Sequence, residues 1–144
     1  MARHATARPV VRTNPTSLAA PVGKYSHLAA PPEGHRLVWI SGQVGNDTDG
    51  QVPADAEQQT HLVFANIHRL LEELGAGPEQ VLKLLTFVAG TDSLPGWSAA
   101  RDKVYADWYP DGLYPAHSLA VVTALARPDL LVETEGVVAV PLAP

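Results

Sequence analysis

DAEQQTHLVFANIHRLLEELG, residues 55–75, is the stretch that decides the fold. Asp55 suits a helix N-cap, with Gln58 three residues further on, and Gly75 suits the left-handed position that ends a helix. Between these ends the apolar residues recur at steps of three and four, at Val63, Phe64, Ile67, Leu70, Leu71 and Leu74. This period predicts an amphipathic helix whose apolar stripe packs against another layer of the fold.

Segments on both sides of this helix predict the strands of that layer. Residues 36–45, RLVWISGQVG, alternate between two faces. One face is expected to carry Leu37, Trp39 and Ser41, and the other Val38, Ile40 and Gly42. Residues 81–90, VLKLLTFVAG, are apolar on both faces, as expected of a buried central strand. Further strands are expected at residues 25–30, 117–125 and 131–140.

A second helix is expected over residues 95–109, PGWSAARDKVYADWY, with Pro110 ending it. The resulting order is strand, strand, helix, strand, helix, strand, strand. It predicts an α+β fold, a single domain in which two helices cover one face of a mixed sheet. Because the strands are apolar on both faces, the other face is expected to meet further copies of the chain in a closed homo-oligomer.

Composition bounds the classes of function. The 144 residues, 46% hydrophobic and 17% charged, fit one globular domain. We expect a flexible N-terminal extension over residues 1–18 and one domain over residues 19–144. The net charge of -5 argues against a nucleic-acid partner, and the absence of cysteine excludes disulfides and thiolate chemistry. Since no stretch suits a membrane span or a secretion signal, a cytoplasmic location without a membrane partner is expected.

Two acidic residues in the last predicted strand give the strongest chemical signal. Glu133 and Glu135, in LVETEGVV, are two residues apart and so point to the same side, roughly 7 Å from each other. Burying such a pair is costly unless a ligand or a shared proton compensates; alternatively, both are solvated at a wet edge. The two explanations are equally supported for Glu133. Glu135 lies deeper in the apolar run, which favours a functional role.

His117, in PAHSL (residues 115–119), begins the preceding strand. A neutral imidazole can accept or donate a proton near neutral pH, which suits acid–base catalysis, but a lone histidine is more often structural. No third ligand accompanies His61 and His68, so no metal site is expected. The glycine-containing segments match neither a phosphate-binding loop nor a dinucleotide fingerprint.

Eight segments, in their order and spacing, resemble the RidA/YjgF family of reactive-intermediate deaminases. They are APVGKYSH, LVWISGQVG, VPADAEQQT, VFANIHRLLEELGAG, VLKLLTFVAGTD, VYADWY, PAHSL and LVETEGVVAV. The resemblance spans residues 14–140. It implies a chorismate-mutase-like fold assembled as a barrel-like homotrimer with clefts between subunits. It also implies hydrolysis of enamines and imines to ammonia and a keto acid, without metal or cofactor.

The same resemblance implies a set of site residues. Tyr25 matches the tyrosine of the family's pocket, Gly42 its glycine, and Glu135 the glutamate that places the attacking water. The family's arginine, which holds the substrate carboxylate, is matched by His117, so catalysis is expected to involve Glu135, His117 and Tyr25. The expected substrate-binding residues are Gly42, Ser41, Ser26 and Trp39. An imidazole cannot replace the fixed charge and five donors of a guanidinium, so activity on 2-imino acids is doubtful.

Two functions of different classes remain. The first is a cofactor-free enzyme that hydrolyses a C–N bond of a small reactive molecule, with specificity altered by His117. The alternative is a non-catalytic trimer that binds or senses a small ligand. Ribonuclease activity, an older idea for this family, is disfavoured by the acidic charge balance.

Overall fold

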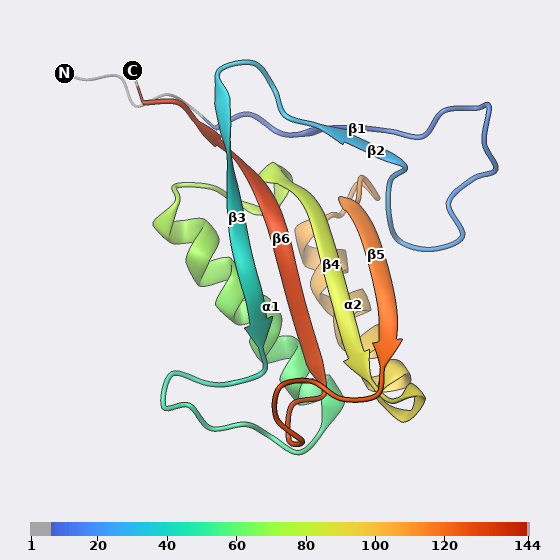
Figure 1. Ribbon diagram of the computed structural model, residues 1–144. Helices are drawn as coiled ribbons and strands as arrows, with labels where there is room; N and C mark the ends of the chain where they lie inside the picture. The colour runs from blue at the N-terminus through green and yellow to red at the C-terminus, as the bar shows by residue number, and fades with distance from the viewer. Residues whose placement is uncertain (1–6, 144) are drawn as a thin grey trace.

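A four-stranded sheet forms the centre of the structure, a computed structural model that describes residues 7–143 (Figure 1). Its strands are β3 (His35–Val44), β4 (Val81–Ala89), β5 (Ala116–Val122) and β6 (Val132–Pro141). They lie in the order β3-β6-β4-β5. β6 is antiparallel to both of its neighbours, and β4 is parallel to the edge strand β5. The sheet is therefore mixed, as the sequence predicts.

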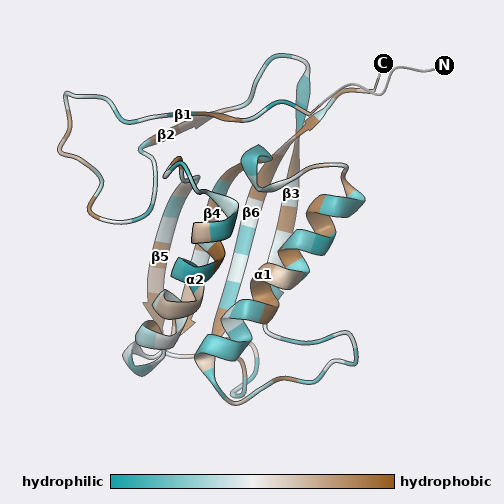
Figure 2. Ribbon diagram, turned by 180° about the vertical axis from the view of Figure 1, so that it is seen from behind, coloured by the Kyte–Doolittle hydropathy of each residue, from teal (hydrophilic) through white to brown (hydrophobic). Residues whose placement is uncertain are grey.

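Both long helices cover one face of this sheet (Figure 2). α1 (Ala56–Glu73) begins after Asp55, whose side chain accepts a hydrogen bond from the backbone N–H of Gln58 at 2.9 Å. α2 (Leu94–Trp108) follows the short 3-10 helix η2 (Thr91–Ser93), and a second one, η1 (Pro78–Gln80), precedes β4. The core between helices and sheet includes Val63, Ile67, Leu71, Leu84, Val88, Val132 and Val138. The predicted α+β fold is confirmed, and within residues 7–143 neither helix is long and apolar enough to cross a membrane.

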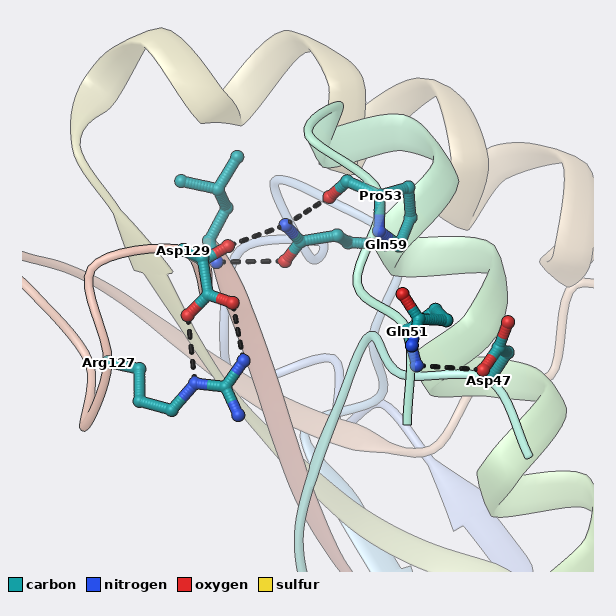
Figure 3. Close-up of polar contacts among 7 residues, drawn as sticks. Asp47, Gln51, Pro53, Gln59, Arg127 and Asp129 are labelled. Atoms are coloured by element: carbon teal, nitrogen blue, oxygen red, sulfur yellow. Dashed lines mark hydrogen bonds and ion pairs between the residues drawn. The ribbon is translucent and has the colours of Figure 1, made fainter. Parts of the chain in front are cut away.

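The end of β3 packs tightly against α1. A Cβ on Gly45 would lie 2.5 Å from Cβ and 2.6 Å from Cα of Gln59, so no side chain fits at position 45. The fully buried amide of Gln59 donates to the carbonyls of Pro53 and Asp129, both at 2.8 Å, and accepts from the N–H of Leu131 at 2.9 Å (Figure 3). One side chain thus ties α1 to two loops, the loop that precedes the helix and the loop that precedes β6.

A small sheet outside the main one was not predicted. β1 (Val11–Thr13) pairs antiparallel with β2 (Leu28–Ala30), so the strand expected at residues 25–30 exists only in its second half and does not join the main sheet. Arg12 of β1 donates to the carbonyls of Val81, at 2.8 Å, and Leu113. The segment expected to be a flexible extension is therefore held to the fold at Arg12. Residues 1–6 lie outside the described residues, and the domain boundary at residue 18 stays a prediction.

The face of the sheet opposite the helices carries apolar side chains that no other segment of residues 7–143 covers. Trp39 is 68% exposed and Leu37 is 41% exposed, both on the β3 side of this face. One end of the face is covered, where Val10 packs on Leu82 and Ala139. We call the uncovered part the open face. Further copies of the chain are expected to bury this surface.

Candidate functional site

An irregularity in β3 shapes the open face along the edge strand. Ile40 pairs with Gly136, and Gln43 pairs with Thr134, so Ser41 and Gly42 together oppose the single residue Glu135. Two residues opposite one is a β-bulge, which breaks the regular alternation of side chains along a strand. The sequence could not reveal it, because the assignment of faces assumed unbroken alternation.

Gly42 lies against the side chain of Glu133. A Cβ on Gly42 would be 2.7 Å from Cδ and 2.9 Å from Cγ of Glu133. Gly42 therefore belongs to the same face as Glu133, which corrects the expectation that it lies opposite Ser41. Only a glycine leaves room for this carboxylate over the bulge.

The two carboxylates point to one face, as their spacing predicts. In β4, Leu85 pairs with Glu135 and Phe87 pairs with Glu133, so each carboxylate stands beside an apolar side chain. Glu135 is exposed and Glu133 is half-buried. A carboxylate on an apolar surface that a partner later covers becomes a strong hydrogen-bond acceptor for water or a ligand.

His117 belongs to the other side of the sheet. It pairs with Leu84, a core residue, and its ring stacks on the indole of Trp97 from α2, with 5.8 Å between centroids and 9° between planes. Its Nε2 is hydrogen-bonded to Oγ1 of Thr86 at 3.0 Å, and this oxygen is 3.1 Å from Oγ1 of Thr134. A polar chain under the helices thus runs across three strands.

The surroundings of His117 keep its ring neutral. Burial, followed by the positive charges of Arg101 and Lys83, lowers the pKa of His117 from 6.5 to about 4. Removing a charged imidazolium from water and placing it near two cations both disfavour the protonated form. At neutral pH His117 therefore carries no charge with which to attract a carboxylate, although its ring can still form hydrogen bonds.

Tyr25 and Ser26 lie beside the beginning of β5. The backbone N–H of Ser26 donates to the carbonyl of Pro115 at 3.1 Å, and its hydroxyl donates to the carbonyl of Tyr114 at 2.6 Å. The Tyr25 hydroxyl accepts a hydrogen bond from the N–H of Val22 at 3.3 Å. These bonds hold the predicted pocket tyrosine near the edge strand that carries His117.

The predicted site residues thus form two groups within one chain. An edge group contains Tyr25, Ser26 and His117, and an open-face group contains Trp39, Ser41, Gly42 and Glu135. Across β4, the partners of Leu84 are His117 and Gly136, whereas the partners of Leu85 are Ser118 and Glu135. Since neighbouring side chains alternate, His117 and Glu135 point to opposite faces of the sheet. A single chain does not bring the two groups together.

Two hollows on the surface lie away from both groups. One of about 500 Å³ is lined by the loop from Asp47 to Pro53 and by α1. Another of about 410 Å³ runs between the outer sides of α1 and α2. Neither contains a predicted site residue. Among residues 7–143 no group of three or more His, Asp or Glu side chains is placed to hold a metal ion.

A charged cluster that was not predicted lies next to His117. The guanidinium carbon of Arg101 lies 4.6 Å from the ring centroid of Trp97, on whose ring His117 also stacks. Nε of Arg101 donates to Asp102 at 2.8 Å, and Nζ of Lys24 lies 3.0 Å from the same carboxylate oxygen. A signal for this arrangement exists in the sequence, since Trp97 and Arg101 are four residues apart on a predicted helix and so share a face.

Comparisons with known sequences and structures agree on one family. The sequence profile described as Endoribonuclease L-PSP matches residues 16–140. A RutC family protein of Synechocystis is 28% identical over 125 residues, covering 85% of this chain and 90% of that protein. The crystal structure of YyfB from Yersinia pestis, a protein of unknown function of the conserved Rid protein family, matches with a TM-score of 0.76 and 30% identity, over 92% of this chain and 100% of the other.

A more distant structure shares the fold alone. Escherichia coli TdcF, crystallised with bound serine, is 20% identical, with a TM-score of 0.64. The match covers 76% of this chain and 87% of TdcF.

Proposed function

Because the chain belongs to the RidA/YjgF family, we propose that it hydrolyses a carbon–nitrogen bond in a small enamine, imine or related molecule without a cofactor. The observation that carries the proposal is the carboxylate arrangement on the open face. A glycine in the bulge makes room for Glu133, and Glu135 stands opposite the same bulge. Such an arrangement suits a site in which a carboxylate positions water.

We place the complete site between copies of the chain. The edge group and the open-face group point away from each other within one chain, so a cleft that contains both needs β5 of one copy against the open face of another. Exposed Trp39 and Leu37 supply apolar surface for that contact. A barrel-like homotrimer with three such clefts is the assembly we propose, since closed symmetry buries every open face in the same way.

The proposed chemistry is the addition of water to a C=N bond. Glu135 accepts a proton from water while the water oxygen bonds to the imine carbon, and this proton passes to the nitrogen to give a carbinolamine. The hydroxyl proton of the carbinolamine then moves to the nitrogen, the C–N bond breaks, ammonia leaves, and a C=O bond forms. Tyr25 and neutral His117 would provide hydrogen bonds at the wall of the cleft, and Ser41, Gly42, Ser26 and Trp39 would contact the substrate.

The neutral ring of His117 separates this protein from relatives that hold a substrate carboxylate with an arginine at the matching position. A charge-assisted bidentate pair is worth about 2–5 kcal/mol in a buried contact. An uncharged imidazole supplies no such pair, so we expect slow ammonia release from 2-aminoacrylate compared with arginine-bearing relatives. The substrate is therefore expected to differ from the simplest 2-imino acids.

Ammonia release from freshly generated enamines and imines tests the proposal. The Glu135→Gln variant should lose about 100-fold or more in kcat, because proton transfer by a positioned carboxylate contributes at least that factor. Glu72→Gln, on the exposed surface of α1, is the matched control and should retain wild-type turnover. Wild-type rates in Glu135→Gln would refute the role of this carboxylate.

A small-ligand-binding protein is the second candidate. It is favoured by the serine bound to TdcF, which has the same fold. A ligand that binds tightly and is recovered unchanged, with no ammonia released from any enamine or imine, would favour it over hydrolysis. Ribonuclease activity, named in the family's description, has little support from a chain with a net charge of -5. Failure of highly purified protein to cleave RNA would exclude it.

A further inference from the structure

The charged cluster on α2 offers a guanidinium beside the position where the family's arginine is missing. Arg101 lies one helical turn after Trp97, and its guanidinium packs over the indole ring with 4.6 Å between its carbon and the ring centroid. It also lies 5.6 Å from the ring centroid of Tyr105. Its side chain is only 14% exposed. Contact with two aromatic rings restricts the rotamers of the guanidinium, so less entropy is lost when it binds a ligand.

The hydrogen-bonding capacity of Arg101 is only partly used. Within residues 7–143 its Nε donates to Asp102, and no hydrogen bond involves its two terminal nitrogens. Neither of these nitrogens is a buried atom without a partner, so both reach the molecular surface. The side of the fork that matches a carboxylate in two parallel hydrogen bonds is therefore available.

The balance of charge in the cluster also favours an anion. Lys24 and Arg101 both bind the carboxylate of Asp102, and their hydrogen bonds lower the pKa of that carboxyl although its partial burial acts in the opposite direction. Two cations share one anion here, while His117 is neutral. The cluster of Lys24, Arg101 and Asp102 therefore carries a net charge of +1.

We propose that Arg101 anchors a carboxylate group of the ligand that occupies the cleft beside the edge group. The inference rests on the proposed cleft between copies and deepens it by naming the residue that recognises a carboxylate on the substrate, so that the enamine or imine is anionic and not uncharged. Arg101 comes from α2 and not from β5, so the carboxylate lies in a different place from that of a substrate held by an arginine at position 117. This difference reconciles an anionic substrate with slow turnover of 2-aminoacrylate.

Binding of pyruvate to the assembled protein tests the anchor, with pyruvamide as the neutral probe of the same size. Calorimetry should show that wild type prefers pyruvate and that Arg101→Gln binds it about 10- to 100-fold more weakly, with pyruvamide unchanged. Arg101→Lys keeps the charge but not the fork, so it should give an intermediate loss. Lys103→Gln, on the same helix with its Nζ on Glu57 at 2.8 Å, is the matched control and should bind pyruvate as wild type does.

A second readout separates a direct role from a general structural one. Because the charge of Arg101 contributes to lowering the pKa of His117, Arg101→Gln should raise that pKa in an NMR titration while the assembly stays intact. Equal pyruvate affinity in wild type and Arg101→Gln would overturn the proposal, as would a wild type that does not distinguish pyruvate from pyruvamide. If Arg101→Gln does not assemble, Arg101→Lys and the comparison of the two probes on wild type decide the question.

The experiments give different results if the Arg101 anchor is wrong than if the proposed hydrolysis is wrong. Pyruvate binding that depends on Arg101, without ammonia release from any substrate, keeps the anchor and removes the enzyme. Ammonia release that Arg101→Gln leaves unchanged keeps the enzyme and removes the anchor.

Discussion

Gly42 and Glu133 touch across β3 and β6, so closely that a Cβ on the glycine would lie 2.7 Å from Cδ of the glutamate. The contact exists because a bulge in β3 turns Gly42 toward the open face. It sets the position of one carboxylate and leaves Glu135 beside it facing out of the sheet. The clash involves the end of a flexible side chain and not the backbone, so this glycine serves the site more than the fold.

Two glycine substitutions should therefore affect different properties, one the activity and the other the stability of the fold. Gly42→Ala is expected to lower turnover or ligand affinity with little change in stability, because Glu133 can swing away from the new methyl group. Gly45→Ala, whose Cβ would meet the backbone of Gln59 at 2.6 Å, is expected to destabilise the fold by roughly 2–4 kcal/mol. Urea unfolding and activity assays on both variants check this. A strongly destabilised Gly42→Ala would contradict the assignment.

Replacing Gln59 should loosen both loops that its amide holds. Gln59→Met removes three hydrogen bonds of a fully buried amide and leaves the partly buried carbonyl of Asp129 and N–H of Leu131 without their partner, at a cost of roughly 2–4 kcal/mol. Thermal unfolding measures the loss. The exposed neighbour Gln58 is the control, and Gln58→Met should unfold close to the wild-type temperature. Similar unfolding temperatures for the two variants would argue against the role of Gln59.

Stability should depend on pH through His117. Its folded pKa of about 4 lies below the ordinary value of 6.5, so between these values the unfolded chain binds a proton that the folded protein does not. The stability gained from keeping His117 neutral is complete above pH 6.5 and is lost as the pH falls toward 4, by up to roughly 3 kcal/mol. Urea midpoints between pH 4 and 7 should show this slope. His117→Gln should flatten it and His61→Gln, on the exposed side of α1, should not; equal slopes in all three proteins would exclude His117 as the source.

The proposed assembly depends on Trp39. Trp39→Glu places a charge on the exposed apolar surface of the open face and is expected to shift the protein from trimer to monomer in sedimentation experiments, because an unpaired buried charge is costly at an interface. Ala106→Glu, exposed on α2, should leave the sedimentation unchanged. A trimer that persists in Trp39→Glu would mean that the open face is not the contact between copies.

Much of the fold follows from sequence periodicity. The three- and four-residue steps over residues 55–75 predict α1, and the runs of apolar residues predict the four main strands, because these patterns report directly on which side chains must leave water. Both helices, the mixed sheet and the apolar open face agree with this expectation. β1 escaped prediction because its three residues carry no period. Its position depends on Arg12, whose guanidinium donates to the carbonyl of Leu113, 101 residues further along the chain.

The site was harder to predict than the fold. Spacing alone placed Glu133 and Glu135 on one face, whereas Gly42 was misplaced because a bulge changes the parity of every residue after it. The opposite orientations of His117 and Glu135 depend on the pairing of β4 with two different strands, which no local pattern encodes. Arg101 was overlooked because its importance arises from the packing of α2 against β5.

Hydrogen bonds connect His117 to Thr86 and Thr86 to Thr134, and the indole of Trp97 stacks on the imidazole. The side chains at positions 86, 97, 117 and 134 therefore form one contiguous set of contacts. Arginine at position 117 would place a longer, permanently charged group among partners that contact a small neutral ring. Accommodating it would require concerted exchanges on two strands and a helix, and His117→Arg alone is expected to disturb the packing around Trp97 and Thr86.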